Sequence, residues 1–137
     1  GGNIGNSLLL AKDIMVGGNR LPLISYQKKL SDALKIMNQK KLGIIVIIKN
    51  KYIAGLVTDG DLRREMKYFS KSNDLKKFMK KKPLMINESM TASKALGIMN
   101  EKKITSLLVV SDKDFKRKNN VTLKGIIHIH FLLKHGL

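Results

Sequence analysis

Apolar residues recur along this chain at helical spacing in two places. Two sets of four lie at positions i, i+3, i+4 and i+7: Leu30, Ala33, Leu34 and Met37, and then Ala92, Ala95, Leu96 and Met99. Residues at this spacing share one face of an α-helix, so each set predicts a helix that buries that face. We expect Ser89 to cap the second helix, because its hydroxyl can accept a backbone hydrogen bond.

Each predicted helix is followed by two short apolar runs that predict strands. The first run, Ile44–Ile48 in one case and Leu107–Val110 in the other, is apolar at consecutive positions. That pattern is typical of a strand covered on both faces. The second run opens with a glycine, Gly55 or Gly125.

The links around these strands differ between the two series. Lys49–Lys51 suits a hairpin turn between the paired strands. The corresponding link, Ser111–Asn120, is longer and more polar, and we expect it to be a mobile loop. Further helices are expected from Asp61 and from Phe131 onward.

The two series of elements are copies of one another. Ala33–Lys41 and Ala95–Lys103 are identical at seven of nine positions, at an offset of 62 residues. Each copy therefore reads strand–helix–strand–strand–helix, and the fold class is α+β with two tandem β-α-β-β-α repeats. One unit of about 60 residues is marginally stable alone, so we expect the two to pack with pseudo-twofold symmetry. A cleft between them would be a natural ligand site.

The segment Gly55–Arg64 holds the best candidate for chemistry. A strand passes through a polar corner, Thr58–Gly60, into a helix expected to open at Asp61. The Asp61 carboxylate can accept hydrogen bonds from both hydroxyls of a ribose, while Thr58 and the free N–H groups at the helix start can hold a phosphate or a base edge. The alternative is structural, because Asp is a common N-cap and a strand-end hydroxyl often bonds the backbone.

Composition narrows the classes of protein. The chain of 137 residues is 43% apolar, and it has no Cys, which excludes disulfides and thiolate chemistry. It has no run of 18 apolar residues and no signal-peptide pattern, which favours a cytoplasmic protein that does not span a membrane. The net charge of +17 could suggest nucleic acid, but the lysines are scattered and only four of the 27 basic residues are Arg. We interpret the charge as solvated surface, and expect no nucleic-acid partner.

The order of elements, the repeat and the Gly55–Asp61 corner resemble a tandem pair of CBS domains, also called a Bateman module. Such pairs bind adenosine nucleotides or related metabolites between the repeats and regulate an attached enzyme or transporter. The resemblance covers the chain from about Leu9 to its end.

A closer resemblance is to the C-terminal half of bacterial arabinose-5-phosphate isomerases. It rests on five segments: Asp13–Met15, Asn19–Pro22, Thr58–Arg64, Lys103–Ser106 and Ile127–Leu137. Members of this family carry a sugar-isomerase (SIS) domain followed by a CBS pair. They convert ribulose 5-phosphate to arabinose 5-phosphate for Kdo synthesis, in the lipopolysaccharide or capsule pathway.

That resemblance implies a regulatory fragment. Gly1–Gly5 resembles the end of the SIS domain, so residues 1–10 are expected to be a linker, 11–72 the first CBS repeat and 73–137 the second. The acid/base pair for isomerisation belongs to the SIS domain, so this fragment is not expected to isomerise a sugar. Its expected partners are the SIS domain, a second copy of the module within a tetrameric parent, and a nucleotide-type effector. The effector is expected to be an adenine nucleotide or a CMP-type nucleotide sugar, with no resident cofactor.

The resemblance also implies a set of ligand-binding residues. They comprise the corner, the residues before each buried strand, and two histidines: Thr58, Asp59, Gly60, Asp61 and Arg63; Leu42, Gly43 and Ile44; Ile104, Thr105 and Ser106; His128 and His130. Arg63 and the neighbouring Arg64 would meet a phosphate or carboxylate, unless both are solvated helix surface. The residues before the strands would support a base or sugar ring, and their alternative role is plain core and strand entry.

Copy two departs from the pattern at the acid. Thr58 aligns with His128 and Asp61 with Phe131, which cannot accept a hydrogen bond from a hydroxyl. His128 and His130 could point the same way, and we expect a polar contact to an anionic ligand or a buried histidine there. A metal site would need further ligands, and His135 is the only other histidine. Two alternatives therefore stay open: a ligand-binding module, or a dimer-forming scaffold that no longer binds a ligand.

Overall fold

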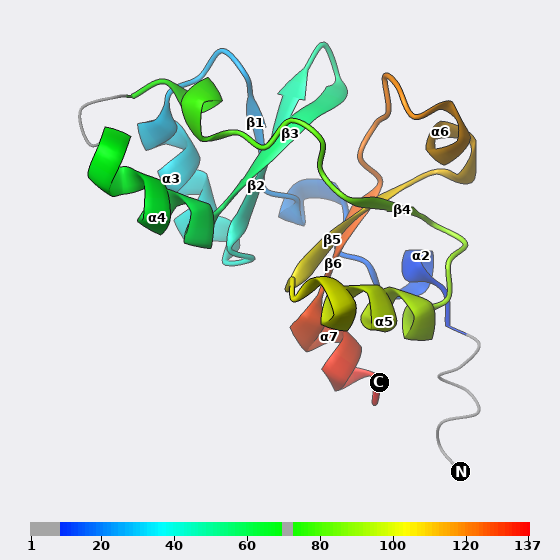
Figure 1. Cartoon of the computed structure of the whole chain (residues 1–137). Helices are drawn as coiled ribbons and strands as arrows, with labels where there is room; N and C mark the ends of the chain where they lie inside the picture. Colours follow the sequence, from blue (N-terminus) through cyan, green and yellow to red (C-terminus); the bar gives the residue numbers. More distant parts are fainter. Residues whose placement is uncertain (1–8, 70–72) are drawn as a thin grey trace. The chain divides into compact units, whose positions relative to one another are not determined.

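The computed structural model describes residues 9–69 and 73–137, and there the chain forms two three-stranded sheets (Figure 1). Residues 1–8 of the predicted linker and residues 70–72 lie outside the described residues. The chain divides into two compact units, residues 22–83 in one and residues 1–21 with 84–137 in the other. The predicted order of elements and the α+β class are confirmed.

Each sheet is mixed, with a parallel and an antiparallel neighbour on either side of its central strand. β2 pairs in parallel with β1 and antiparallel with β3, and β5 pairs in the same way with β4 and β6. The strands are β1 (Leu23–Ser25), β2 (Ile44–Lys49), β3 (Tyr52–Thr58), β4 (Met85–Asn87), β5 (Ser106–Val110) and β6 (Gly125–His128).

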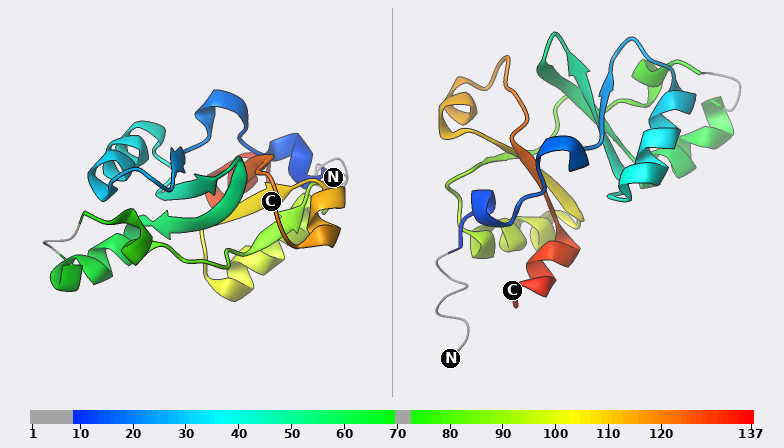
Figure 2. Two further views of the ribbon diagram at one scale, coloured as in Figure 1. Left: turned by 90° about the horizontal axis from the view of Figure 1, so that it is seen from above. Right: turned by 180° about the vertical axis from the view of Figure 1, so that it is seen from behind.

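Helices cover one side of each sheet (Figures 1 and 2). In the unit of residues 22–83, α3 and α4 lie on the same side of the sheet. In the other unit, α5 and α7 lie side by side. The helices are α2 (Ala11–Ile14), η1 (Gly18–Arg20), α3 (Leu30–Lys40), α4 (Asp59–Phe69), η2 (Leu75–Phe78), α5 (Ala92–Lys102), α6 (Asp112–Arg117) and α7 (Ile129–Lys134).

The predicted helical faces are buried in two separate cores. Leu30, Ala33 and Met37 of α3 pack in the core of one unit, with Leu34 half-buried at its edge. In the other unit, the corresponding face of α5 is buried in the same way: Ala92, Ala95 and Met99, with Leu96 at the edge. Burial of these apolar faces is the main force that holds each helix on its sheet.

The peptide that precedes the first strand of each copy packs in the unit formed mainly by the other copy. Val16 forms a bridge with Ile126 in β6, and its N–H and C=O make hydrogen bonds of 2.8 and 3.0 Å. Lys80 forms the matching bridge with Leu56 in β3, with hydrogen bonds of 3.1 and 2.8 Å. Each unit is therefore completed by residues from outside its own repeat.

The predicted hairpin is confirmed, and two other expectations are wrong. Asn50 and Lys51 link β2 to β3 with φ of 51° and 68°, as a two-residue turn between antiparallel strands requires. Ser111–Asn120 is not a loop throughout, because it contains α6. Thr91, and not Ser89, caps α5 by accepting a hydrogen bond from the N–H of Lys94.

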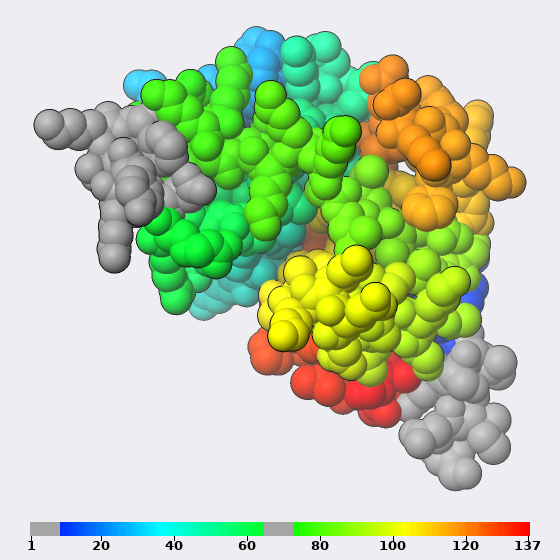
Figure 3. All heavy atoms as spheres, viewed as in Figure 1, coloured from blue at the N-terminus to red at the C-terminus, as the bar shows by residue number. Residues whose placement is uncertain are grey.

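Polar contacts explain the helix that the sequence did not predict. The Ser111 hydroxyl caps α6 by accepting from the N–H of Asp114, and the carboxylate of Asp114 accepts from Thr122. The Asp112 carboxylate accepts hydrogen bonds from Asn87 and from Ser89, which lies two residues before the N-cap of α5. None of the residues of α6 is buried, and the segment lies on the surface (orange in Figure 3).

No helix in the described part of the chain is both long and apolar enough to cross a membrane.

Candidate functional site

The corner at the end of β3 is built as the sequence suggests, but with a different residue as the cap. β3 ends at Thr58 and α4 begins at Asp59, two residues earlier than expected. The Thr58 Oγ accepts a hydrogen bond of 3.0 Å from the N–H of Asp61, so Thr58 is the N-cap and Asp61 is the third residue of the helix. The structural alternative, in which Asp61 caps α4, is therefore wrong, and the carboxylate is not used for that role.

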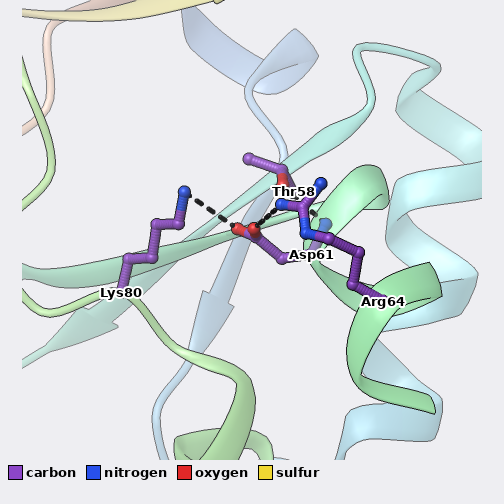
Figure 4. Close-up of polar contacts among 4 residues, drawn as sticks. All are labelled: Thr58, Asp61, Arg64 and Lys80. Carbon is purple, nitrogen blue, oxygen red and sulfur yellow. Dashed lines mark hydrogen bonds and ion pairs between the residues drawn. The ribbon is translucent and has the colours of Figure 1, made fainter. Parts of the chain in front are cut away.

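Asp61 is buried, with a relative exposure of 7%, and it is the one charged residue in the described core. Figure 4 shows two cations on either side of its carboxylate. An Arg64 guanidinium nitrogen lies 2.5 Å from Oδ1, and the Lys80 Nζ lies 3.4 Å from Oδ2. Oδ2 is itself buried, and Lys80 is the cation that faces it.

These surroundings keep Asp61 ionised. Burial alone raises the pKa of a carboxyl group, because it penalises the charged form. Here the hydrogen bond with Thr58 and the positive charges of Lys80 and Arg64 outweigh burial, and the pKa of Asp61 is below its ordinary value of 3.8. The site therefore presents a carboxylate that can only accept hydrogen bonds.

The structure also brings the residues before β2 to this corner. The N–H of Asp59 donates to the carbonyl of Gly43 at 2.9 Å, and Ile44 pairs with Thr58. Gly43 has a φ of +69°, a conformation that favours glycine. Leu42 is half-buried next to it.

Arg63 and Asp59 are turned to solvent. Their side chains form an ion pair of 2.5 Å, and both are largely exposed. A Cβ placed at Gly60 would lie 3.5 Å from a guanidinium nitrogen of Arg64 and 4.0 Å from the Thr58 Oγ.

Copy two repeats the backbone of this corner without its acid. The N–H of Ile129 donates to the carbonyl of Thr105 at 2.8 Å, and Ser106 pairs with His128, which correspond to the contacts of Gly43 and Ile44. Ile104 is half-buried before them. Phe131 occupies the position of Asp61, and the Arg20 guanidinium lies 5.6 Å from its ring centre.

The two histidines lie together, as expected. The rings of His128 and His130 stack with centroids 4.8 Å apart, and the His128 Nδ1 accepts from the N–H of His130 at 3.2 Å. Burial, followed by the charge of His130, holds the pKa of His128 below its ordinary value of 6.5. In the described residues no group of three or more His, Cys, Asp or Glu is placed to hold a metal ion.

Lys80 was not anticipated from the sequence. It comes from the peptide before the second copy, and its role depends on the bridge between Lys80 and Leu56. A signal is present in the repeat: Met15 and Val16 match Met79 and Lys80, because the two methionines pack against the matching glycines Gly125 and Gly55.

Comparison with known proteins identifies this architecture. The CBS domain family matches residues 11–68 and 75–131. The chain is a tandem pair of CBS domains.

Several relatives resemble the CBS pair over its whole length. An uncharacterized protein of Rickettsia prowazekii is 36% identical over 138 residues, which are 100% of this chain and 41% of that protein. The arabinose 5-phosphate isomerase KdsD of Escherichia coli K12 is 35% identical over 141 residues, which are 100% of this chain and 40% of the enzyme. The CBS pair thus spans about two fifths of the length of these relatives.

Solved CBS structures share the fold. CBSX2, a protein of Arabidopsis thaliana, in complex with AMP has a TM-score of 0.76 and 22% identity, covering 93% of this chain and 96% of that chain. The CBS pair of MJ0100, in complex with 5′-methylthioadenosine and S-adenosyl-L-methionine, has a TM-score of 0.77 and 16% identity, covering 93% and 94%. At this identity the likeness shows the fold alone.

Proposed function

We propose that this CBS pair senses a nucleotide-type ligand and transmits its binding to a sugar isomerase of the arabinose-5-phosphate type. The identity of 35% with KdsD over the whole chain supports the link to that enzyme. The buried, ionised carboxylate of Asp61, beside the Thr58 hydroxyl, is the observation that carries the sensing role. In the parent protein, the proton transfer between adjacent sugar carbons would belong to the SIS domain.

The proposed ligand is a nucleotide or a CMP-type nucleotide sugar. An acceptor-only carboxylate matches a ribose diol, which offers two O–H donors side by side. Adenine nucleotides are the alternative, and the AMP-bound and S-adenosylmethionine-bound neighbours support it. Binding would regulate the isomerase if the ligand prefers one arrangement of the module over another.

The proposed ligand-binding residues fall into two groups. Those of copy one, residues 42–44 and 58–61, meet at the corner that carries Asp61 and would hold the ribose. Those of copy two are residues 104–106 with His128 and His130, and they lack a carboxylate, so they would offer ring contacts, hydroxyl groups and a histidine contact to an anionic group.

Calorimetry with variants that remove the charge at position 61 tests the sensing role. We expect Asp61→Asn, and more strongly Asp61→Ala, to weaken binding of the tightest ligand among AMP, ATP, CMP and a CMP-sugar by about ten- to a hundredfold, because hydrogen bonds to a buried charged group are lost. Glu101→Gln, on the exposed end of α5, is the matched control and should bind as the unaltered protein does. Equal affinity in the Asp61 variants would contradict the proposal.

The second candidate function is a scaffold that organises the catalytic domains without binding a ligand. Phe131 in place of an acid favours it, because half of the paired site has lost its carboxylate. Native mass spectrometry of the freshly purified protein separates the two functions. A co-purified nucleotide supports sensing, whereas a ligand-free oligomer that also binds none of the four nucleotides in calorimetry supports the scaffold.

A further inference from the structure

Arg64 and Lys80 contact different oxygens of the Asp61 carboxylate, at different distances. Arg64 makes a hydrogen bond to Oδ1 from the next turn of the same helix. Lys80 lies farther from its oxygen, with Nζ 3.4 Å from Oδ2 against 2.5 Å for the Arg64 contact, and both cationic side chains are largely exposed. A ribose diol that takes both carboxylate oxygens must displace a cation, and Lys80 is the one held less firmly.

The charge of the cluster shows what a displaced Lys80 would seek. One carboxylate, one guanidinium and one ammonium carry a net charge of +1 (−1 + 1 + 1). A neutral nucleoside would turn Lys80 away from its counter-ion and offer nothing in return. A phosphate attached to the same ribose would give the ammonium a new anionic partner.

We infer that Lys80, with Arg64 beside it, makes this site selective for a phosphorylated ribose ligand over the corresponding nucleoside. The inference rests on the proposed function. Lys80 releases Asp61 to the diol and binds the phosphate. The bridge between Lys80 and Leu56 holds the lysine backbone at the edge of β3, so its ammonium group stays within reach of the corner after it leaves the carboxylate.

The second copy supports a shared role for the acid and the lysine. The position of Lys80 is filled there by Val16, and the position of Asp61 by Phe131. Both members of the pair are replaced together by apolar residues on the same backbone. An uncharged side chain at position 80 is therefore compatible with the fold, which makes its substitution a clean test.

The experiment compares Lys80→Met with Lys82→Met, an exposed neighbour, in calorimetry with AMP and adenosine and with CMP and cytidine. We expect the unaltered protein to favour the monophosphate by at least about tenfold, as a charge-assisted hydrogen bond provides. Lys80→Met should lose most of that preference, with nucleoside affinity equal or higher. Lys82→Met should retain the preference.

Three results would overturn the inference. If Lys80→Met lowers the affinities for nucleoside and monophosphate equally, Lys80 only organises the site and does not select for phosphate. An unchanged preference in Lys80→Met, with binding still sensitive to Asp61→Asn, would refute the inference and leave the proposed function standing. Failure of the unaltered protein to bind any of the four probes would refute the inference, and the proposed function would fall with it only if ATP and the CMP-sugar also fail to bind. Thermal unfolding of each variant checks that the fold is intact.

Discussion

At the scale of single residues, Asp61 decides what this corner can do. A capping role would have occupied its carboxylate with the first turn of α4, but Thr58 has taken that role. The carboxylate is instead buried, ionised and shared between two long cationic side chains from different segments. Such a group is costly to bury without partners, and under the inference above a bound ribose would have to take the place of Lys80 as one of them.

The ion cluster should make stability depend on pH through Asp61. Because its pKa is lower in the folded protein than the ordinary 3.8, ionised Asp61 stabilises the fold above that pH, and this contribution is lost as the pH falls through the folded value. We expect the gap in free energy of unfolding between the unaltered protein and Asp61→Asn to be widest near pH 7 and to shrink below pH 3.8. Urea unfolding across this range measures the gap, and a gap that is constant with pH would contradict the assignment.

At the scale of elements, the sequence was sufficient where apolar periodicity determines structure. That periodicity predicts the buried faces of α3 and α5 and the buried strands β2 and β5. Because the two copies share the pattern, the prediction for one copy supports the prediction for the other. It was insufficient for α6, because Ser111–Asn120 has no apolar face. That helix depends on hydrogen bonds that the carboxylates of Asp112 and Asp114 accept from Asn87 and Thr122, outside the helix itself.

The site shows the same division between local and distant information. Thr58, Gly60 and Asp61 form a local motif, so the sequence could place them together. Lys80 meets them only through a bridge between separate segments, which no local spacing reveals. The sequence could not show whether Thr58 or Asp61 is the N-cap of α4, because both side chains can accept the capping hydrogen bond.

Gly55 within β3 and Gly125 at the start of β6 should resist any side chain. A Cβ at Gly55 would lie 2.4 Å from the Lys80 carbonyl oxygen, and one at Gly125 would lie 2.8 Å from that of Val16. We expect Gly55→Ala and Gly125→Ala each to lower the free energy of unfolding by about 1–3 kcal/mol, since backbone must move.

Gly97 supplies the opposite case on α5. Nothing lies within 4 Å of a Cβ there, so Gly97→Ala should raise the free energy of unfolding by about 0.5–1 kcal/mol through helix propensity. Chemical denaturation of the three alanine variants measures these changes. Equal effects at all three positions would show that close packing at β3 and β6 is not what requires glycine.

At the scale of the whole molecule, the net charge of +17 is a standing cost to the compact state. Salt screens such repulsion, so the midpoint of thermal unfolding should rise as NaCl increases from about 0.01 M to about 0.5 M. A variant with Lys113, Lys116 and Lys118 of the α6 segment changed to Gln should show a weaker rise. A midpoint that does not respond to salt would mean that the charges are too dispersed to matter.

The peptides that contain Val16 and Lys80, each paired with a strand of the other copy, determine where the protein can be divided. Cutting between the two copies would strip each sheet of a neighbour that the other half supplies. A piece from Pro22 to Pro83 retains its lysine bridge and is the natural candidate for independent expression. The complementary piece is discontinuous, so it calls for a circularly permuted gene that joins the first segment to the last.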